Sequence, residues 1–155
     1  EIAGAPATPS EAVLARVVAS GALALPCFSG QGGPFAARKG AIRGTVAPDD
    51  LPALATLYCA VMTDLMLTRL GAAAGDLIVE GSLAANPAFG ALLAALRPAQ
   101  SVLAATDAAG AARGAALLAQ WPDARAAPSA RRIAPAAIGG LGGYREAWTQ
   151  AVVGG

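Results

Sequence analysis

The sequence predicts an α/β fold, ordered helix–strand–helix–strand–helix, with a mostly parallel sheet. Apolar residues keep helical spacing over 51–70 and 87–96, while the short apolar runs 76–80 and 101–104 are bounded by polar or turn-forming residues. Strands that alternate with helices usually pair in parallel beneath a helical cover. A sheet has about five or six strands on average, so we expect further strands of this sheet to lie upstream.

The first helix is expected to start at Thr8-Pro9-Ser10-Glu11, a capping box with proline at the first helical position. Gly21 is expected to end this helix. Its apolar positions are Val13, Leu14, Val17 and Val18. The following stretch, from Gly30 to Gly44, holds five glycines and Pro34, and it predicts an ordered surface loop.

Two carboxylates mark the start of the second helix, at Pro48-Asp49-Asp50, because negative charge favours the N-terminus of a helix. Helical spacing of apolar residues continues to Gly71, the expected C-cap, and gives a helix of about 20 residues. The strand 76–80 is expected to be buried. Asn86 and Pro87 then open the next helix as its N-cap and first residue.

Beyond the second strand, Asp107 is expected to cap an alanine-rich helix that reaches about Gln120. Proline, alanine and arginine dominate the sequence after that point, apart from a short amphipathic helix expected at 144–152. The sequence therefore divides into a domain over residues 1–121 and a Pro/Ala-rich tail over residues 122–155, which carries the terminal helix.

The composition argues against several classes of function. Eleven basic and ten acidic residues give a net charge of +1, which is unlike a nucleic-acid-binding protein or a polybasic membrane patch. The chain has no histidine, so histidine-based triads and histidine metal ligands are excluded. Cys27 and Cys59 lack metal-site or redox spacing, which favours reduced, packed thiols in a cytosolic protein.

The mean hydropathy of +0.53 makes a membrane segment worth testing. The longest uncharged run, 17–37, is long enough to span a bilayer, but six glycines and prolines interrupt it, so we expect no spanning helix there. The chain begins Glu1-Ile2, without a methionine or a basic leader region. We therefore expect no signal peptide, and we expect residue 1 not to be the start of the gene product.

The strongest local feature is the turn between the strand 76–80 and the helix that follows. Small residues let a flat ligand approach the backbone, and the amides at a helix N-terminus favour polar or anionic groups. Asn86 carries both a donor and an acceptor, as recognition of a heterocycle edge requires. An ordinary strand–helix turn with an asparagine N-cap fits the same residues, and they leave both interpretations open. No phosphate-binding GxxxxGK[ST] loop occurs.

Residues 77–86 (LIVEGSLAAN) resemble the adenosine-binding segment of the FGGY-family carbohydrate kinases, in the sugar kinase/Hsp70/actin superfamily. Three further segments resemble that family in the same order: 25–30 (LPCFSG), 37–44 (ARKGAIRG) and 111–119 (AARGAALLA). The sequence departs from the family pattern where Ser82 replaces a glycine, where Gln31-Gly32 replaces Glu-Arg, and where Tyr58-Cys59 replaces Glu-Gly.

The resemblance implies the C-terminal part of an ATP-dependent kinase for a small sugar of the pentulose or hexulose class. The fold would be part of an RNase H-like (actin-like ATPase) domain, incomplete at its N-terminus. The cofactors would be ATP and Mg²⁺, with the metal held mainly by phosphates and by residues elsewhere. The partners would be the sugar, the missing N-terminal kinase domain and, as an open alternative, a second copy of the chain.

The resemblance also assigns residues to the adenosine. No catalytic residue and no metal ligand is expected in this part of the enzyme. Leu83 or Phe89 would supply apolar contact. The expected adenosine-binding residues are Gly81, Ser82, Leu83, Ala84 and Asn86. The competing interpretations are a non-catalytic, alanine-rich helical interaction domain and a nucleotide-binding regulator.

The charged residues allow more than one role. Asp49 and Asp50 fit helix capping better than acid–base chemistry. Asp64 is expected on a solvated helix face, and Glu80 is expected either to order its turn or to reach a ribose. The cluster of Arg125, Arg131 and Arg132 fits a solvated surface loop better than a phosphate clamp.

Overall fold

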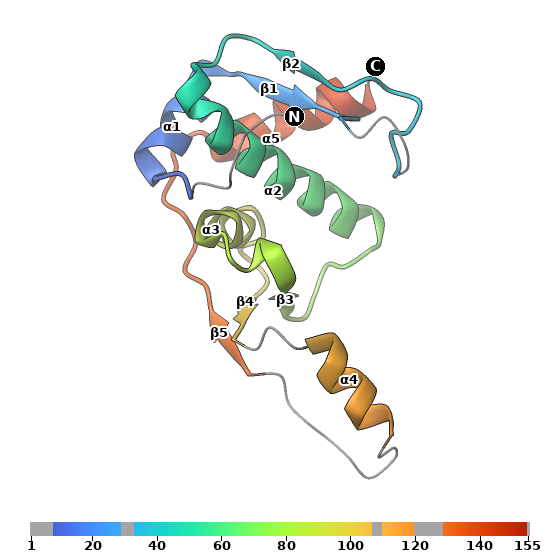
Figure 1. Ribbon diagram of the computed structural model, residues 1–155. Coiled ribbons are helices and arrows are strands. Elements are labelled where there is room, and N and C mark those ends of the chain that lie inside the picture. Colours follow the sequence, from blue (N-terminus) through green and yellow to red (C-terminus); the bar gives the residue numbers. More distant parts are fainter. Residues whose placement is uncertain (1–7, 29–32, 107–109, 120–128, 155) are drawn as a thin grey trace.

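The computed structural model describes residues 8–28, 33–106, 110–119 and 129–154 (Figure 1). Helices and short strands alternate along the chain, and this confirms the predicted α/β fold class. The helices are α1 (Glu11–Ser20), α2 (Leu51–Arg69), α3 (Pro87–Leu96), α4 (Gly110–Leu118) and α5 (Leu141–Val153), with 3₁₀ turns η1 (Pro48–Asp50) and η2 (Gly81–Leu83). The strands are β1 (Leu23–Leu25), β2 (Ala41–Arg43), β3 (Leu77–Val79), β4 (Val102–Ala105) and β5 (Ala130–Arg132).

The strands form two small sheets at opposite ends of the molecule, with α2 and α3 between them (Figure 1). Strands β3 and β4 pair in parallel, as the sequence predicts, with Leu77 opposite Val102. Strand β5 extends this sheet by pairing with β4 in the antiparallel direction. Strands β1 and β2 form a separate antiparallel pair. Helix α4 stands apart from the other elements (Figure 1).

Three strands were not predicted. Strand β2 lies in the expected loop 30–44, and β1 precedes it. All three residues of β2 are exposed, so no run of buried apolar residues marks this strand in the sequence. Strand β5 lies in the expected irregular tail. Its arginines at 131 and 132 are exposed at the edge of the sheet, where charged side chains are tolerated and discourage further pairing.

The burial predicted for the strand 76–80 is only half correct. In β3, Val79 is buried beneath the helical layer, whereas 43% of Ile78 is exposed. Side chains alternate between the two faces of a strand, and α3 packs on one face of the neighbouring strand β4. The sequence pattern shows an apolar strand, but it does not show which face is covered.

Helix α2 is the centre of the core. Residues 48–69 have the length and apolar character of a membrane-spanning helix, with a mean hydropathy of 1.5. In the structure this stretch instead packs against α1, α3, α5 and β1, and this favours a core helix. Its buried apolar side chains are Ala53, Leu54, Leu57, Ala60, Val61 and Leu65.

The helix ends follow the capping signals with two corrections. The N-cap of α1 is Ser10 and not Thr8, since the Ser10 hydroxyl accepts a hydrogen bond from the Val13 amide at 3.4 Å. Asp50 makes no capping hydrogen bond. Its carboxylate instead binds the Arg16 guanidinium of α1 at 2.5 and 2.9 Å, and this contact lowers the pKa of Asp50. This pair therefore joins the start of α2 to α1.

The terminal helix α5 belongs to the same core. The Tyr144 hydroxyl donates to the Ala22 carbonyl at 2.9 Å, and the Trp148 indole Nε1 donates to the Ala24 carbonyl at 2.7 Å. Both side chains are buried, and burial raises the pKa of the Tyr144 phenol. The helix begins earlier than the expected 144–152. The domain boundary expected at 121 and the cap expected at Asp107 lie outside the described residues and stay predictions.

Replacing the buried indole tests the attachment of α5. We expect Trp148→Phe to lower the free energy of unfolding by about 1–3 kcal/mol, because the buried Ala24 carbonyl loses its donor. Urea denaturation measures the change. The control is Val153→Ala on the same helix, at a side chain that is 54% exposed, and it should change stability by less than about 0.5 kcal/mol. Equal effects of the two variants would contradict this role of Trp148.

Candidate functional site

The turn between β3 and α3 brings the five predicted site residues together on one short segment. It contains the 3₁₀ turn η2, where the Ala84 amide donates to the Gly81 carbonyl at 3.1 Å and the Asn86 amide donates to the Leu83 carbonyl at 3.2 Å. Gly81 has a φ of +67°, a conformation that favours glycine. Among the described residues other than Gly81 and its two chain neighbours, no heavy atom lies within 4 Å of the position that a Cβ at Gly81 would occupy. The backbone here is open to an approaching ligand.

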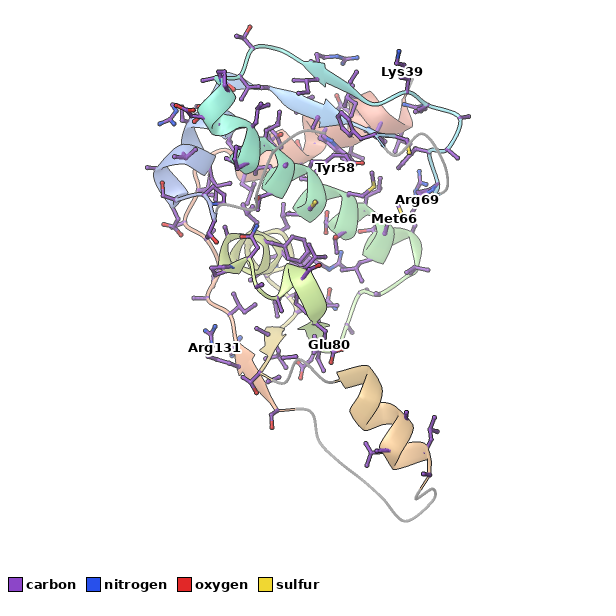
Figure 2. All side chains as sticks on the ribbon, viewed as in Figure 1. Lys39, Tyr58, Met66, Arg69, Glu80 and Arg131 are labelled. Carbon is purple, nitrogen blue, oxygen red and sulfur yellow. The ribbon has the colours of Figure 1, made fainter. Side chains whose placement is uncertain are left out.

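The exposed surface of this turn is small and partly apolar. Gly81, Ser82 and Leu83 are exposed, and 42% of the Leu83 side chain is accessible. Ala84 is half-buried. Glu80 is exposed at the end of β3 (Figure 2). Phe89, the alternative apolar contact, is 2% exposed and belongs to the core, so Leu83 is the one of the two that a ligand can reach.

The Asn86 carboxamide is engaged at both ends. Its Oδ1 accepts hydrogen bonds from the Ala88 and Phe89 amides at 3.1 and 3.4 Å, which makes it the predicted N-cap of α3. Its Nδ2 donates to the hydroxyl of Thr56, in α2, at 3.2 Å. Asn86 therefore shapes the turn and does not present a free acceptor to a ligand. The assignment of all five residues to a binding site stays a prediction.

Asp64 is a second polar centre, and it corrects a prediction. The sequence predicts a solvated face for Asp64, but its side chain is 9% exposed and pairs with Arg97 at 2.8 Å. Arg145 of α5 lies 3.8 Å from the same carboxylate. Asp64 shares the helical face of the buried Leu57 and Val61, seven and three residues earlier. That spacing is the signal that indicates burial of Asp64.

Arg97 also holds the loop that follows α2. Its guanidinium donates to the Ala72 carbonyl and, at 2.5 Å, to the Gln100 side chain. Gln100 in turn donates to the carbonyls of Ala74 and Gly75 at 3.3 and 3.2 Å. Among the described residues, no buried side-chain polar atom lacks a partner. The network is therefore satisfied within the chain and acts as a structural connection.

Two open pockets flank this network, one at the end of α3 opposite the turn and one between α2 and α5. Their volumes are about 330 and 390 Å³, and both are lined by Asp64, Thr68 and Arg145. Neither pocket is lined by the predicted site residues 81–86. The turn is thus an exposed surface on the described chain and not part of either pocket.

The described residues contain no group of three or more histidine, cysteine, aspartate or glutamate side chains that could hold a metal ion. Of the predicted arginine cluster, Arg131 and Arg132 are exposed on β5 (Figure 2 labels Arg131). Arg125 lies outside the described residues. Cys27 and Cys59 are half-buried, and burial raises the pKa of the Cys59 thiol.

Comparison with known proteins identifies similar domains. The family model described as "Carbohydrate kinase FGGY, C-terminal domain" matches residues 1–128. A solved structure, a carbohydrate kinase from Novosphingobium aromaticivorans, matches with a TM-score of 0.76 and 28% sequence identity. The match covers 95% of this chain and 32% of the solved kinase, so this chain spans about a third of that protein's length. No curated protein matches the chain. These matches confirm the resemblance that the sequence predicts.

The buried ion pair yields a stability prediction. We expect Arg97→Met to lower the free energy of unfolding by about 3–5 kcal/mol, because it leaves the buried Asp64 carboxylate without its nearest cation. The matched control is Arg132→Met at an exposed edge position, which should cost less than about 0.5 kcal/mol. Thermal and urea unfolding measure both. A loss for Arg97→Met no larger than that of the control would contradict a structural role for the network.

Proposed function

This chain belongs to the FGGY carbohydrate kinases as their C-terminal domain, with the actin-like ATPase fold, and from that premise we propose that it supplies the adenosine-binding surface of an ATP-dependent sugar kinase. The chain spans about a third of the solved kinase it matches. In the proposed enzyme, the remaining part holds the sugar and the aspartate that accepts the proton of the sugar hydroxyl. The sugar is a small one, of the pentulose or hexulose class.

The observation that carries this proposal is the position and openness of the turn 81–86. It follows β3, which pairs in parallel with β4, and ligands of parallel sheets bind outside the carboxyl ends of the strands. Gly81 leaves its backbone accessible, Ser82 offers an exposed hydroxyl, and Leu83 offers an exposed apolar side chain. An adenine ring and its ribose fit such a surface, because it combines backbone amides with one apolar contact.

The same residues fit the nucleoside end of ATP better than its phosphates. The turn carries no lysine or arginine, and no metal-binding cluster lies among the described residues. We therefore assign the phosphates and Mg²⁺ to the remainder of the enzyme, where the metal offsets the charge of the phosphates when bound. This chain's residues bind and orient the base and ribose, and Ala84 and Asn86 support the turn from its inner side.

The proposed setting follows from the same premise. The N-terminal kinase domain is the principal partner of this chain, because the ATP of such an enzyme lies between its two domains. A homodimer is a further proposal. The cytoplasm is the proposed location, since a sugar kinase needs cytoplasmic ATP. A non-catalytic scaffold domain would bind no nucleotide, whereas a nucleotide-binding regulator would bind it without transferring phosphate.

Nucleotide binding tests the proposal directly. Titration calorimetry of the full-length protein with ATP and ADP should show binding, and Gly81→Val should weaken it about fivefold or more, because a β-branched residue is strained at a φ of +67°. The control is Gly143→Val, on α5, which lacks the positive φ and has open space for a Cβ. No binding at millimolar ATP would refute the kinase proposal, and binding without sugar phosphorylation would favour the regulator.

Asn86 provides a second test, by steady-state kinetics of the full-length kinase. We expect Asn86→Ala to raise the KM for ATP more than it lowers kcat, because the variant loosens the turn and touches no reacting atom. Asn86→Ser keeps an oxygen that caps α3 and should raise the KM by less. A large loss of kcat at unchanged KM for ATP would contradict the assigned role.

A further inference from the structure

Thr56 makes two hydrogen bonds through one buried hydroxyl. Its side chain lies in the first half of α2 and is 6% exposed. The hydroxyl donates to the Pro52 carbonyl at 2.8 Å, and its oxygen accepts from Asn86 Nδ2 at 3.2 Å. A hydroxyl has one proton and two lone pairs, so both bonds form at once. The direction of the second bond is fixed, because the proton of the hydroxyl is already used.

The bond to Asn86 connects two parts of the chain that are 30 residues apart. The other hydrogen bonds of the turn are local: between Gly81 and Ala84, between Leu83 and Asn86, and from the first amides of α3 to Asn86, which accepts them. Among the residues that the structure describes, Thr56–Asn86 is the one side-chain hydrogen bond that joins the turn 80–86 to α2. This contact adds a polar connection between the turn and the core helix to the packing of Ala84 and of α3 against the core.

We propose that Thr56 is a positioning residue for nucleotide binding: it fixes the Asn86 carboxamide, and through it the exposed turn 81–86. This inference rests on the proposed function of that turn. Thr56 is buried and lies behind the turn, so it acts through Asn86 and not on the nucleotide itself. Loosening the turn weakens the binding of ATP in its ground state and transition state alike. Such a loss appears in the KM for ATP and leaves kcat unchanged.

Thr68 offers a matched control on the same helix. Its hydroxyl also donates to the carbonyl four residues earlier, that of Asp64, at 2.9 Å. Its second partner is Arg97 at 3.3 Å, at the end of α2 that faces away from the turn. Thr68 is exposed whereas Thr56 is buried. Thr68→Val therefore removes a threonine hydroxyl with the same kind of backbone bond, at an exposed position, without removing a contact to Asn86.

The test is steady-state kinetics of the full-length kinase with ATP and its sugar. We expect Thr56→Val to raise the KM for ATP about three- to tenfold, the loss that one hydrogen bond produces, with kcat and the KM for the sugar within about twofold of wild type. Thr56→Ser should restore the wild-type KM, since it keeps the hydroxyl. Thr68→Val should leave the KM for ATP unchanged. Equal KM values for wild type and Thr56→Val would overturn the inference.

Asn86→Ser supplies a second readout that does not depend on the folding of Thr56→Val. The serine retains a capping oxygen but lacks the amide that reaches Thr56, so its KM for ATP should rise on its own by a similar factor. In the Asn86→Ser background, Thr56→Val should add no further increase. If the two substitutions raised the KM additively in an enzyme that binds ATP, the inferred coupling between Thr56 and Asn86 would be overturned, while the proposed function would stand. A wild-type enzyme that binds no ATP would instead overturn the proposed function together with this inference.

Discussion

Burial of helix α2 is the constraint on which the rest of the structure depends. The helix is apolar over nearly its whole length, and α1, α3, α5 and β1 each cover part of it. Asp64 of this helix and Asp50, which directly precedes it, are buried carboxylates that need partners, because an unpaired buried charge is costly. Arg97 and Arg16 supply these partners from other elements. Arg16 thereby connects α1, and Arg97 the end of α3, to the central helix. The helix thus positions the other elements both by apolar packing and by these two ion pairs.

The same helix connects the core to the candidate site. Thr56 binds Asn86, Asn86 caps α3, and α3 covers the sheet from which the turn 81–86 emerges. A rigid inner side and an exposed outer side are what a nucleotide-binding turn requires, since ordering a loop on binding costs affinity. Membership of the FGGY carbohydrate kinases fits this arrangement, and the opposite end of α3 serves stability through Arg97.

Local signals predicted the elements that carry them. Capping residues and helical spacing located α2 and α3, and the apolar runs located the parallel pair β3–β4. The three-residue strands β1, β2 and β5 were missed, because pairing with a remote strand defines them more than their own residues do. In the candidate site, the sequence predicted the capping role of Asn86 but not its bond to Thr56. It also misplaced Asp64, whose partner Arg97 lies 33 residues away.

We propose that the turn 81–86 contacts the nucleotide. Hydrogen–deuterium exchange of the full-length kinase, measured with and without ADP, tests this contact, because exposed turn amides exchange quickly until a ligand covers them. We expect ADP to slow exchange across residues 81–86, while the amides around Arg97 keep their rates. Saturating ADP that protects other segments and leaves 81–86 unchanged would show that the nucleotide binds elsewhere.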